Sequence, residues 1–254
     1  MDTFKKDKLT VKICDSRAEL GKVAAADISA CFKKLLAEKE RINVIFAAAP
    51  SQSETLSALV ADQSVEWNRI NAYHMDEYVG LDENAPQLFG NFLKRALFSR
   101  VSFASVNYID GTAQDTEGEI ARYSRLIRSN PPDAVVLGIG ENGHIAFNNP
   151  PEARFDDEAI MKKVRLDEIS RNQQVNDGCF EKIGDVPYYA LTLTIPALVS
   201  AAHLFCAVPA RTKARAVKDT LLGPVDERCP ASILRRQEDA TLYLDRDSSA
   251  MLYE

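Results

Sequence analysis

The stretch DAVVLGIGENGHIAFNNPP, residues 133 to 151, carries the clearest sign of the fold. Its first eight residues form a nearly continuous apolar run, which is typical of a strand buried on both faces of a sheet. A glycine-rich turn follows, and Pro150 and Pro151 then exclude a regular helix within two turns. The stretch therefore predicts a central parallel strand that ends in a tight, irregular loop.

Strand-like and helical patterns alternate on both sides of this run. Strands are expected over residues 9–14, 42–49, 69–75, 106–109, 160–166, 188–195, 202–208 and 241–245. Helices are expected over residues 16–40, 86–99 and 115–129, and also after Pro50 and after Arg211. Such alternation indicates βαβ units. We therefore expect one α/β domain over residues 1–254, with a mostly parallel, Rossmann-like sheet and helices on both faces.

Composition narrows the class of protein. The chain has 254 residues, of which 46% are hydrophobic, so one sizeable core is expected. A net charge of -6 argues against a nucleic-acid partner, because tracking phosphates needs clustered Lys and Arg. No apolar run approaches the roughly 18 residues of a membrane span, and no secretory signal is apparent. We expect a cytoplasmic protein, and the scattered five cysteines and three histidines predict no metal site.

The glycines of the opening stretch allow a different interpretation. Gly138, Gly140 and Gly143 spell G-x-G-x-x-G, the fingerprint of a dinucleotide-binding turn. A real fingerprint needs a helix that opens within the glycines, so that its N-terminal amides face the pyrophosphate. The two prolines rule out that helix, so the sequence disfavours NAD binding. The turn is better suited to present His144, which directly follows the third glycine.

Polar residues gather where the predicted parallel strands end. In such a sheet, ligands bind beyond the carboxyl ends of the strands. The segments at this edge are 50–54, 76–78, 138–149 and 211–213. The sequence therefore predicts one site at the common edge.

Two long motifs at this edge resemble a known family. GIGENGHIAFNNP, residues 138–150, resembles the active-site turn G-x-G-x-D-G-H-I-A-F-N-E-P of the glucosamine-6-phosphate deaminase (isomerase) family. HMDEYVGL, residues 74–81, resembles a second segment of that family, and residues 186–195, 211–214 and 229–234 also fit. The related 6-phosphogluconolactonases share the turn but continue T-A-S-L-F-P and lack M-D-E-Y-V-G-L. The resemblance thus favours the deaminase branch.

The resemblance implies a reaction and its catalytic residues. A 2-amino-sugar 6-phosphate, either glucosamine 6-phosphate or galactosamine 6-phosphate, would become a ketose phosphate with release of ammonia. Asp76 would move a proton between C2 and C1, and His144 would donate to the ring oxygen. Glu141 would orient His144. Neither a metal nor an organic cofactor is implied.

The resemblance also implies how the phosphate is held. Lys213 begins a predicted helix, where the helix dipole adds attraction for an anion. Ser51, Gln52 and Ser53 begin another helix and offer hydroxyls and backbone amides. The arginine that the family uses as a second cation corresponds to Arg171 or, on an equally good alignment, to Gln174.

Two glycines have a steric part in this prediction. Gly140 and Gly143 would leave room for the sugar and for the imidazole of His144.

Three departures from the family pattern affect the predicted chemistry. Glu141 is taken to stand where the turn has aspartate, and Asn149 stands where the family has glutamate. The family's Thr- and Gly-rich phosphate loop is replaced here by residues 48–54, AAPSQSE. These changes leave two alternatives open, namely a non-catalytic sugar-phosphate sensor and an enzyme for a shifted substrate, such as a sugar-lactone phosphate hydrolase.

The segment 150–186 is longer than the usual connection between two secondary-structure elements, which suggests that it has a function of its own. It is expected to form a lid over the site or a subunit contact in a homo-oligomer.

Overall fold

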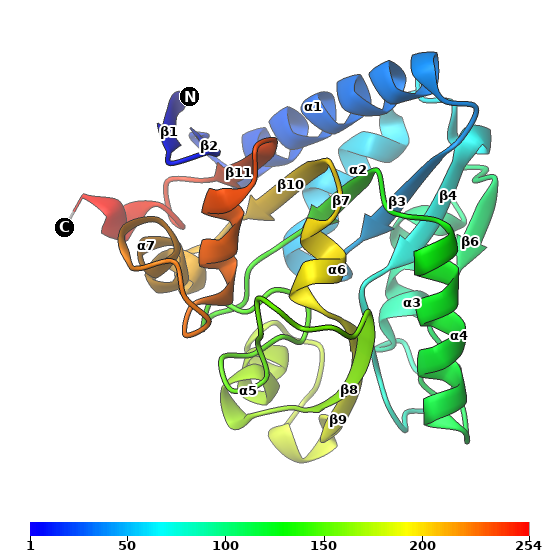
Figure 1. The fold of residues 1–254 in the computed structure, drawn as a ribbon. Coiled ribbons are helices and arrows are strands. Elements are labelled where there is room, and N and C mark those ends of the chain that lie inside the picture. The colour runs from blue at the N-terminus through cyan, green and yellow to red at the C-terminus, as the bar shows by residue number, and fades with distance from the viewer. Residues whose placement is uncertain (254) are drawn as a thin grey trace.

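The computed structural model describes residues 1–253 and has an eight-stranded sheet at its centre (Figure 1). The strand order is β1-β2-β11-β10-β7-β3-β4-β6, and every neighbouring pair is parallel except β1 and β2. The strands are β1 (Asp2–Lys6), β2 (Leu9–Ile13), β3 (Ile42–Phe46), β4 (Ile70–His74), β6 (Ser105–Asn107), β7 (Ala134–Leu137), β10 (His203–Val208) and β11 (Ala240–Leu244). The predicted mostly parallel α/β architecture is confirmed.

Helices cover both faces of this sheet. One face carries α1 (Arg17–Glu38), α2 (Ser53–Ala61) and α3 (Phe89–Leu93), and the other carries α4 (Thr116–Ser129), α6 (Ile195–Val199) and α7 (Ala214–Leu222). Shorter helical turns are η1 (Pro50–Gln52), η2 (Trp67–Arg69), η3 (Lys94–Phe98), η4 (Ile183–Asp185), η5 (Arg211–Lys213), η6 (Pro230–Arg236) and η7 (Ala250–Leu252). Within residues 1–253, no helix is long and apolar enough to cross a membrane.

The apolar run at the start of the stretch 133–151 forms strand β7, whose four residues are all buried. Its residues alternate between two cores: Val136 packs with the α1 and α2 side, whereas Val135 and Leu137 pack with the α4 and α7 side. Full burial of such a side chain contributes about 1.5–3 kcal/mol, so a strand between two helical layers needs apolar residues at every position. This places the loop after Leu137 at the middle of the sheet's edge.

A second, three-stranded antiparallel sheet was not anticipated. It has the order β5-β9-β8, with β5 (Asp76–Tyr78), β9 (Tyr189–Leu193) and β8 (Met161–Arg165). The sequence predicted strands near β8 and β9 but not that they leave the main sheet, and it missed β5. Figure 1 shows β8 and β9 grouped with α5 (Glu168–Asn176). The segment 150–186 is therefore partly regular, with an Asp167 cap on α5 that accepts a hydrogen bond from the Ser170 N–H at 2.7 Å.

A buried histidine joins the end of β4 to the start of β5. The Nε2 atom of His74 accepts a hydrogen bond from the Ile109 N–H at 2.9 Å, and its Nδ1 atom donates to the Asp76 carbonyl at 3.0 Å. Burial lowers the pKa of His74 to about 4, which keeps the ring neutral, as one accepting and one donating nitrogen require. The hydroxyl of Tyr123 donates to the His74 carbonyl at 2.9 Å and accepts from the His74 N–H at 3.1 Å.

We predict that Tyr123→Phe lowers the free energy of unfolding by about 1–3 kcal/mol, because it leaves the buried backbone groups of His74 without a partner. Urea denaturation measures this change. Tyr108→Phe is the matched control, since Tyr108 is 38% exposed and its hydroxyl forms no hydrogen bond within residues 1–253. Equal stabilities of the two variants would contradict the bridging role of Tyr123.

Candidate functional site

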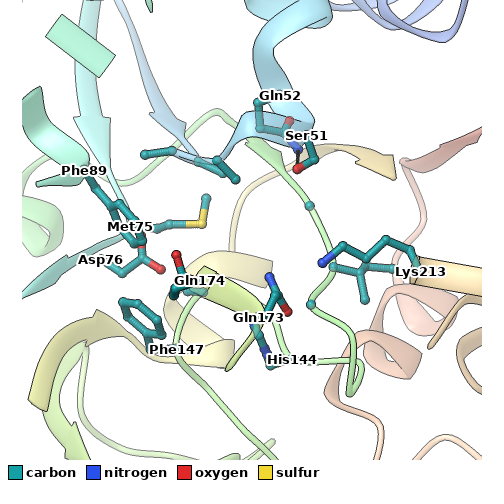
Figure 2. Close-up of a pocket in the computed structure, with 17 residues that line it drawn as sticks. Ser51, Gln52, Met75, Asp76, Phe89, His144, Phe147, Gln173, Gln174 and Lys213 are labelled. Atoms are coloured by element: carbon teal, nitrogen blue, oxygen red, sulfur yellow. Dashed lines mark hydrogen bonds between the residues drawn. The ribbon is translucent and has the colours of Figure 1, made fainter. Parts of the chain in front are cut away.

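A pocket with an empty volume of about 500 Å³ lies beyond the carboxyl ends of β3, β4, β7 and β10. This is where a parallel sheet binds its ligands. Its polar and charged lining residues are Ser51, Gln52, Asp76, His144, Gln173, Gln174 and Lys213. Figure 2 shows Asp76 and Lys213 on opposite sides, with His144 and the two glutamines between them.

Asp76 reaches this pocket from the start of β5. Its side chain is only 6% exposed and lies beside apolar neighbours that include Met75, Phe89 and Phe147 (Figure 2). Burial, and then the charge of Glu77, raise the pKa of this carboxyl well above its usual value. A carboxylate in such surroundings is a stronger base than one in water.

The adjacent Glu77 has a different, structural position. Its carboxylate accepts the backbone N–H groups of Tyr78 and Phe89, both at 2.9 Å, and of Gly90 at 2.8 Å. Burial raises the pKa of Glu77 to about 7, and these three hydrogen bonds lower it in part. Glu77 thus anchors the start of α3, whereas Asp76 stays directed into the pocket.

The glycine turn brings His144 against the backbone. Gly140 donates its N–H to the His144 carbonyl at 2.9 Å, and Gly143 has a φ of +83°, which L side chains rarely adopt. A Cβ atom on Gly140 would lie 2.0–2.3 Å from three atoms of the His144 ring. The imidazole ring therefore packs directly against Gly140, where there is no room for a side chain. Gly143 does not line the pocket and packs instead against Cys229.

The residue that contacts the His144 ring is Asn142, not Glu141. The Asn142 Oδ1 atom accepts a hydrogen bond from Nδ1 of His144 at 2.7 Å. Glu141 is held by its backbone N–H, which donates to Gln173 Oε1 at 2.8 Å. Counted back from His144, the aspartate of the family turn also falls at Asn142. The prediction that Glu141 orients His144 was wrong by one position.

Two further residues of the predicted site, Ser53 and Arg171, lie outside the pocket lining. Ser53 is exposed at the start of α2. Arg171 points away, because its guanidinium donates to the carbonyls of Ile183 and Val186 and stacks on the ring of Tyr188 at 4.0 Å. Of the two candidates for the family's arginine position, Gln174 is the one that lines the pocket.

Asn149 is buried next to the site rather than in it. Its Oδ1 atom accepts a hydrogen bond from the Ser170 hydroxyl at 2.5 Å, and its Nδ2 atom has no hydrogen-bond partner within residues 1–253. It lines a neighbouring cavity together with Arg171. Asn149 therefore links the loop that follows the glycine turn to α5, through Ser170 rather than through His144.

Lys213, Ser51 and Gln52 form the opposite end of the pocket (Figure 2). Lys213 is 4% exposed and forms no ion pair within residues 1–253, and burial lowers the pKa of its ammonium. The Gln52 side chain donates to the Ala207 carbonyl at 3.0 Å, which ties η1 to β10. A buried, unpaired ammonium beside a hydroxyl and an amide is suited to bind an anion.

The sequence did not predict the contact of Asn142 with His144. It also did not predict four residues that line the pocket, namely Met75, Phe89, Phe147 and Gln173. Asn142 could have been found by counting positions in the turn. The apolar residues carry no chemical signal of their own, because core phenylalanines are common.

Known proteins are similar to this chain along most of its length. Residues 15–243 match the family model described as "Glucosamine-6-phosphate isomerases/6-phosphogluconolactonase". A glucosamine-6-phosphate deaminase of Listeria monocytogenes is 36% identical over 211 residues, covering 83% of this chain and 88% of that protein. A glucosamine-6-phosphate deaminase of Streptococcus sanguinis is 30% identical over 240 residues, covering 94% and 97%.

Solved structures agree with this similarity. A monomeric glucosamine-6-phosphate deaminase superposes with a TM-score of 0.86 at 29% identity, covering 95% of this chain and 99% of that one. A 6-phosphogluconolactonase from Thermotoga maritima superposes with a TM-score of 0.75 at 23% identity, covering 94% and 100%, and shares the fold.

We predict that Gly140→Ala displaces the His144 ring, because the added Cβ would meet three ring atoms and the strand end beneath cannot move. Ligand binding measured with inorganic phosphate and the NMR signals of His144 report this displacement: phosphate binding should persist while the His144 signals shift. Gly184→Ala is the matched control, because a Cβ there meets no atom within 4 Å. Unshifted His144 signals in Gly140→Ala would contradict the close contact.

Proposed function

The chain belongs to the family of glucosamine-6-phosphate isomerases and 6-phosphogluconolactonases, and we propose that it isomerises and deaminates a 2-amino-sugar 6-phosphate. The products are a ketose 6-phosphate and ammonia. The observation that carries this proposal is the placement of a buried carboxylate, Asp76, and a buried ammonium, Lys213, on opposite sides of one pocket. A sugar phosphate has its reacting carbons and its phosphate at opposite ends in the same way.

Substrate orientation follows from these charges. The 6-phosphate binds Lys213 and the hydroxyl of Ser51, which leaves C1 and C2 near Asp76. Gln174 supplies an amide where the family has a cation, so Lys213 is the main source of positive charge for the phosphate.

Asp76 performs the proton transfer between carbons. After the ring opens, its carboxylate takes the proton from C2. The electrons of that C–H bond form the C1–C2 double bond, and the electrons of the C1 carbonyl go to O1. O1 takes a proton from the substrate's own C2 ammonium group, which gives a neutral enolamine. Asp76 then returns the proton to C1, which leaves a C2 imine. Water adds to this imine, and ammonia departs. One base near both carbons suffices, and its raised pKa matches it to this task.

The segment 150–186 has a part in this proposal. Helix α5 contributes Gln173 and Gln174 to the lining, so this segment covers the site as a lid. The five free thiols support the predicted cytoplasmic location.

The alternative is a non-catalytic sugar-phosphate sensor. The amides of Asn142 and Asn149 favour it, because they remove two carboxylates from the family turn. Glucosamine 6-phosphate that binds tightly without release of ammonia would identify the sensor.

We predict that Asp76→Asn lowers kcat for ammonia release from glucosamine 6-phosphate at least about 100-fold, because an amide cannot carry the proton. In the unchanged protein, kcat/KM should fall on acidification through the raised pKa of Asp76, at a higher pH than the usual aspartate value of about 3.9. The exposed Glu83→Gln on the same connection is the control. Undiminished ammonia release by Asp76→Asn would refute this assignment.

We predict that Lys213→Met raises KM about 10- to 100-fold with a smaller effect on kcat, since a hydrogen bond to a charged group contributes about 1.5–3 kcal/mol. Steady-state kinetics with the phosphorylated sugar measure this change. Lys218→Met, on the next turn of α7, is the control. A fall in kcat at constant KM would place Lys213 with the reacting carbons instead.

A further inference from the structure

The side chain of Gln52 forms two hydrogen bonds through a single nitrogen atom. Its Nε2 atom donates to the Ala207 carbonyl at 3.0 Å and to the hydroxyl oxygen of Ser51 at 3.2 Å, the second of which is drawn in Figure 2. Ala207 decides the orientation of the amide, because a carbonyl can only accept and must therefore face the nitrogen. The Oε1 atom of Gln52 is buried and has no hydrogen-bond partner within residues 1–253. Both hydrogen bonds of this fully buried side chain thus come from its nitrogen.

This orientation determines the role of the Ser51 hydroxyl. An amide NH2 group can only donate, so Ser51 must accept the hydrogen bond from Gln52. The hydroxyl proton then remains to be donated, and within residues 1–253 it has no acceptor. Ser51 lines the pocket at the end that also contains Lys213. Toward a ligand, the hydroxyl and the ammonium at this end therefore both act as hydrogen-bond donors.

The backbone of the turn η1 offers few donors of its own. Pro50 has no N–H group. The Gln52 N–H donates to the Ala49 carbonyl at 2.9 Å. The Ser53 N–H donates to the carbonyl of Pro50. An anion beside this turn therefore depends on Ser51, so the direction of its hydroxyl proton matters.

The atoms of this arrangement meet above Gly138, the first residue after β7. A Cβ atom there would lie 2.8 Å from Gln52 Nε2, 3.4 Å from the Ala207 oxygen and 3.7 Å from Ser51 Oγ. The hydrogen-bonded ladder between β7 and β10 ends one residue before Gly138 and Ala207. The Gln52 amide therefore lies just beyond that ladder, where it pairs a buried carbonyl and reaches from η1 to β10.

We propose that Gln52 is a positioning residue, whose amide holds the Ser51 hydroxyl as a donor toward the anionic group of the substrate. This inference rests on the proposed function, in which that group is a phosphate. Gln52 acts through Ser51, because both protons of its amide are already donated. Lys213 follows β10, the strand that carries Ala207, so the end of one strand positions both donors. Donors that are fixed before binding lose less conformational freedom when the anion binds, which raises affinity.

A double-mutant cycle in the full chain tests whether Gln52 acts through Ser51. The substrate is glucosamine 6-phosphate, and ammonia release gives KM and kcat. Gln52→Met keeps the length of the side chain but removes its donor, so it should raise KM about two- to tenfold and change kcat less than about twofold. Ser51→Ala should raise KM at least as much. When Ser51→Ala is already present, adding Gln52→Met should change KM by less than about twofold, because the hydroxyl that it positions is absent.

Gln63→Met is the matched control, because Gln63 is exposed just beyond the end of α2. It should leave KM unchanged. A rise in KM from Gln52→Met that is equal with and without Ser51→Ala would overturn the proposal, because Gln52 would then act on the turn as a whole. An unchanged KM in Gln52→Met would overturn it as well.

A second measurement does not depend on the folding of Gln52→Met. Nitrogen-15 NMR of the unchanged protein resolves the two side-chain amide protons of Gln52. Saturation with inorganic phosphate should shift the proton that is donated to Ser51, because hydrogen bonds in a chain polarise one another. In Ser51→Ala, phosphate should leave both protons in place. An equal shift in Ser51→Ala, or no shift in the unchanged protein, would overturn the proposal.

Failure of the proposed function is distinguishable from failure of this inference. If the proposed function is wrong, the unchanged protein releases no ammonia from glucosamine 6-phosphate. The same cycle is then measured as Kd for inorganic phosphate, where the coupling between Gln52 and Ser51 is expected to be the same. Absence of phosphate binding to the unchanged protein would overturn the role of Gln52.

Discussion

The site depends on the two hydrogen bonds of the buried His74 ring. Through the ring, they link the Asp76 carbonyl to the Ile109 N–H. The Tyr123 hydroxyl donates a further hydrogen bond to the His74 carbonyl. Through these hydrogen bonds the chain passes from the parallel sheet into the smaller antiparallel one with the buried Asp76 carbonyl and Ile109 N–H both paired. The start of β5 is thereby fixed at the sheet's edge, and the carboxylate of Asp76 is held in the pocket although its burial is unfavourable.

The charges of the site are few and separated. Asp76 and Lys213 are both buried, and burial shifts the pKa of each toward its neutral form. In the proposed function, a phosphate bound beside Lys213 gives the ammonium a charged partner, whereas Asn142 gives His144 an uncharged one. Under the proposed function, the chain thus keeps Asp76 as the base for the carbon chemistry, while Asn142 and Asn149 are amides where the family pattern has carboxylates.

Much of this architecture could be predicted from the sequence, because β7 needs apolar residues on both faces and the strand ends place Asp76, His144 and Lys213 at one edge. The pairing of β5 with β9 could not, since short strands are paired by tertiary packing. The choice between Arg171 and Gln174 depends on how α5 packs against the segment that ends at Tyr188. The interchange of Glu141 and Asn142 was an error of one position in a turn whose shape follows from the φ of Gly143.

The path of the C2 proton tests the central claim most directly. Glucosamine 6-phosphate labelled with deuterium at C2 is converted in ordinary water, and the ketose 6-phosphate is examined by NMR at C1. If one carboxylate, Asp76, serves both carbons in a pocket shielded from water, part of the deuterium appears at C1 and none does so with Asp76→Asn. Ammonia released by the unchanged protein with no deuterium at C1 under any condition, and with equal yield from Asp76→Asn, would contradict the account.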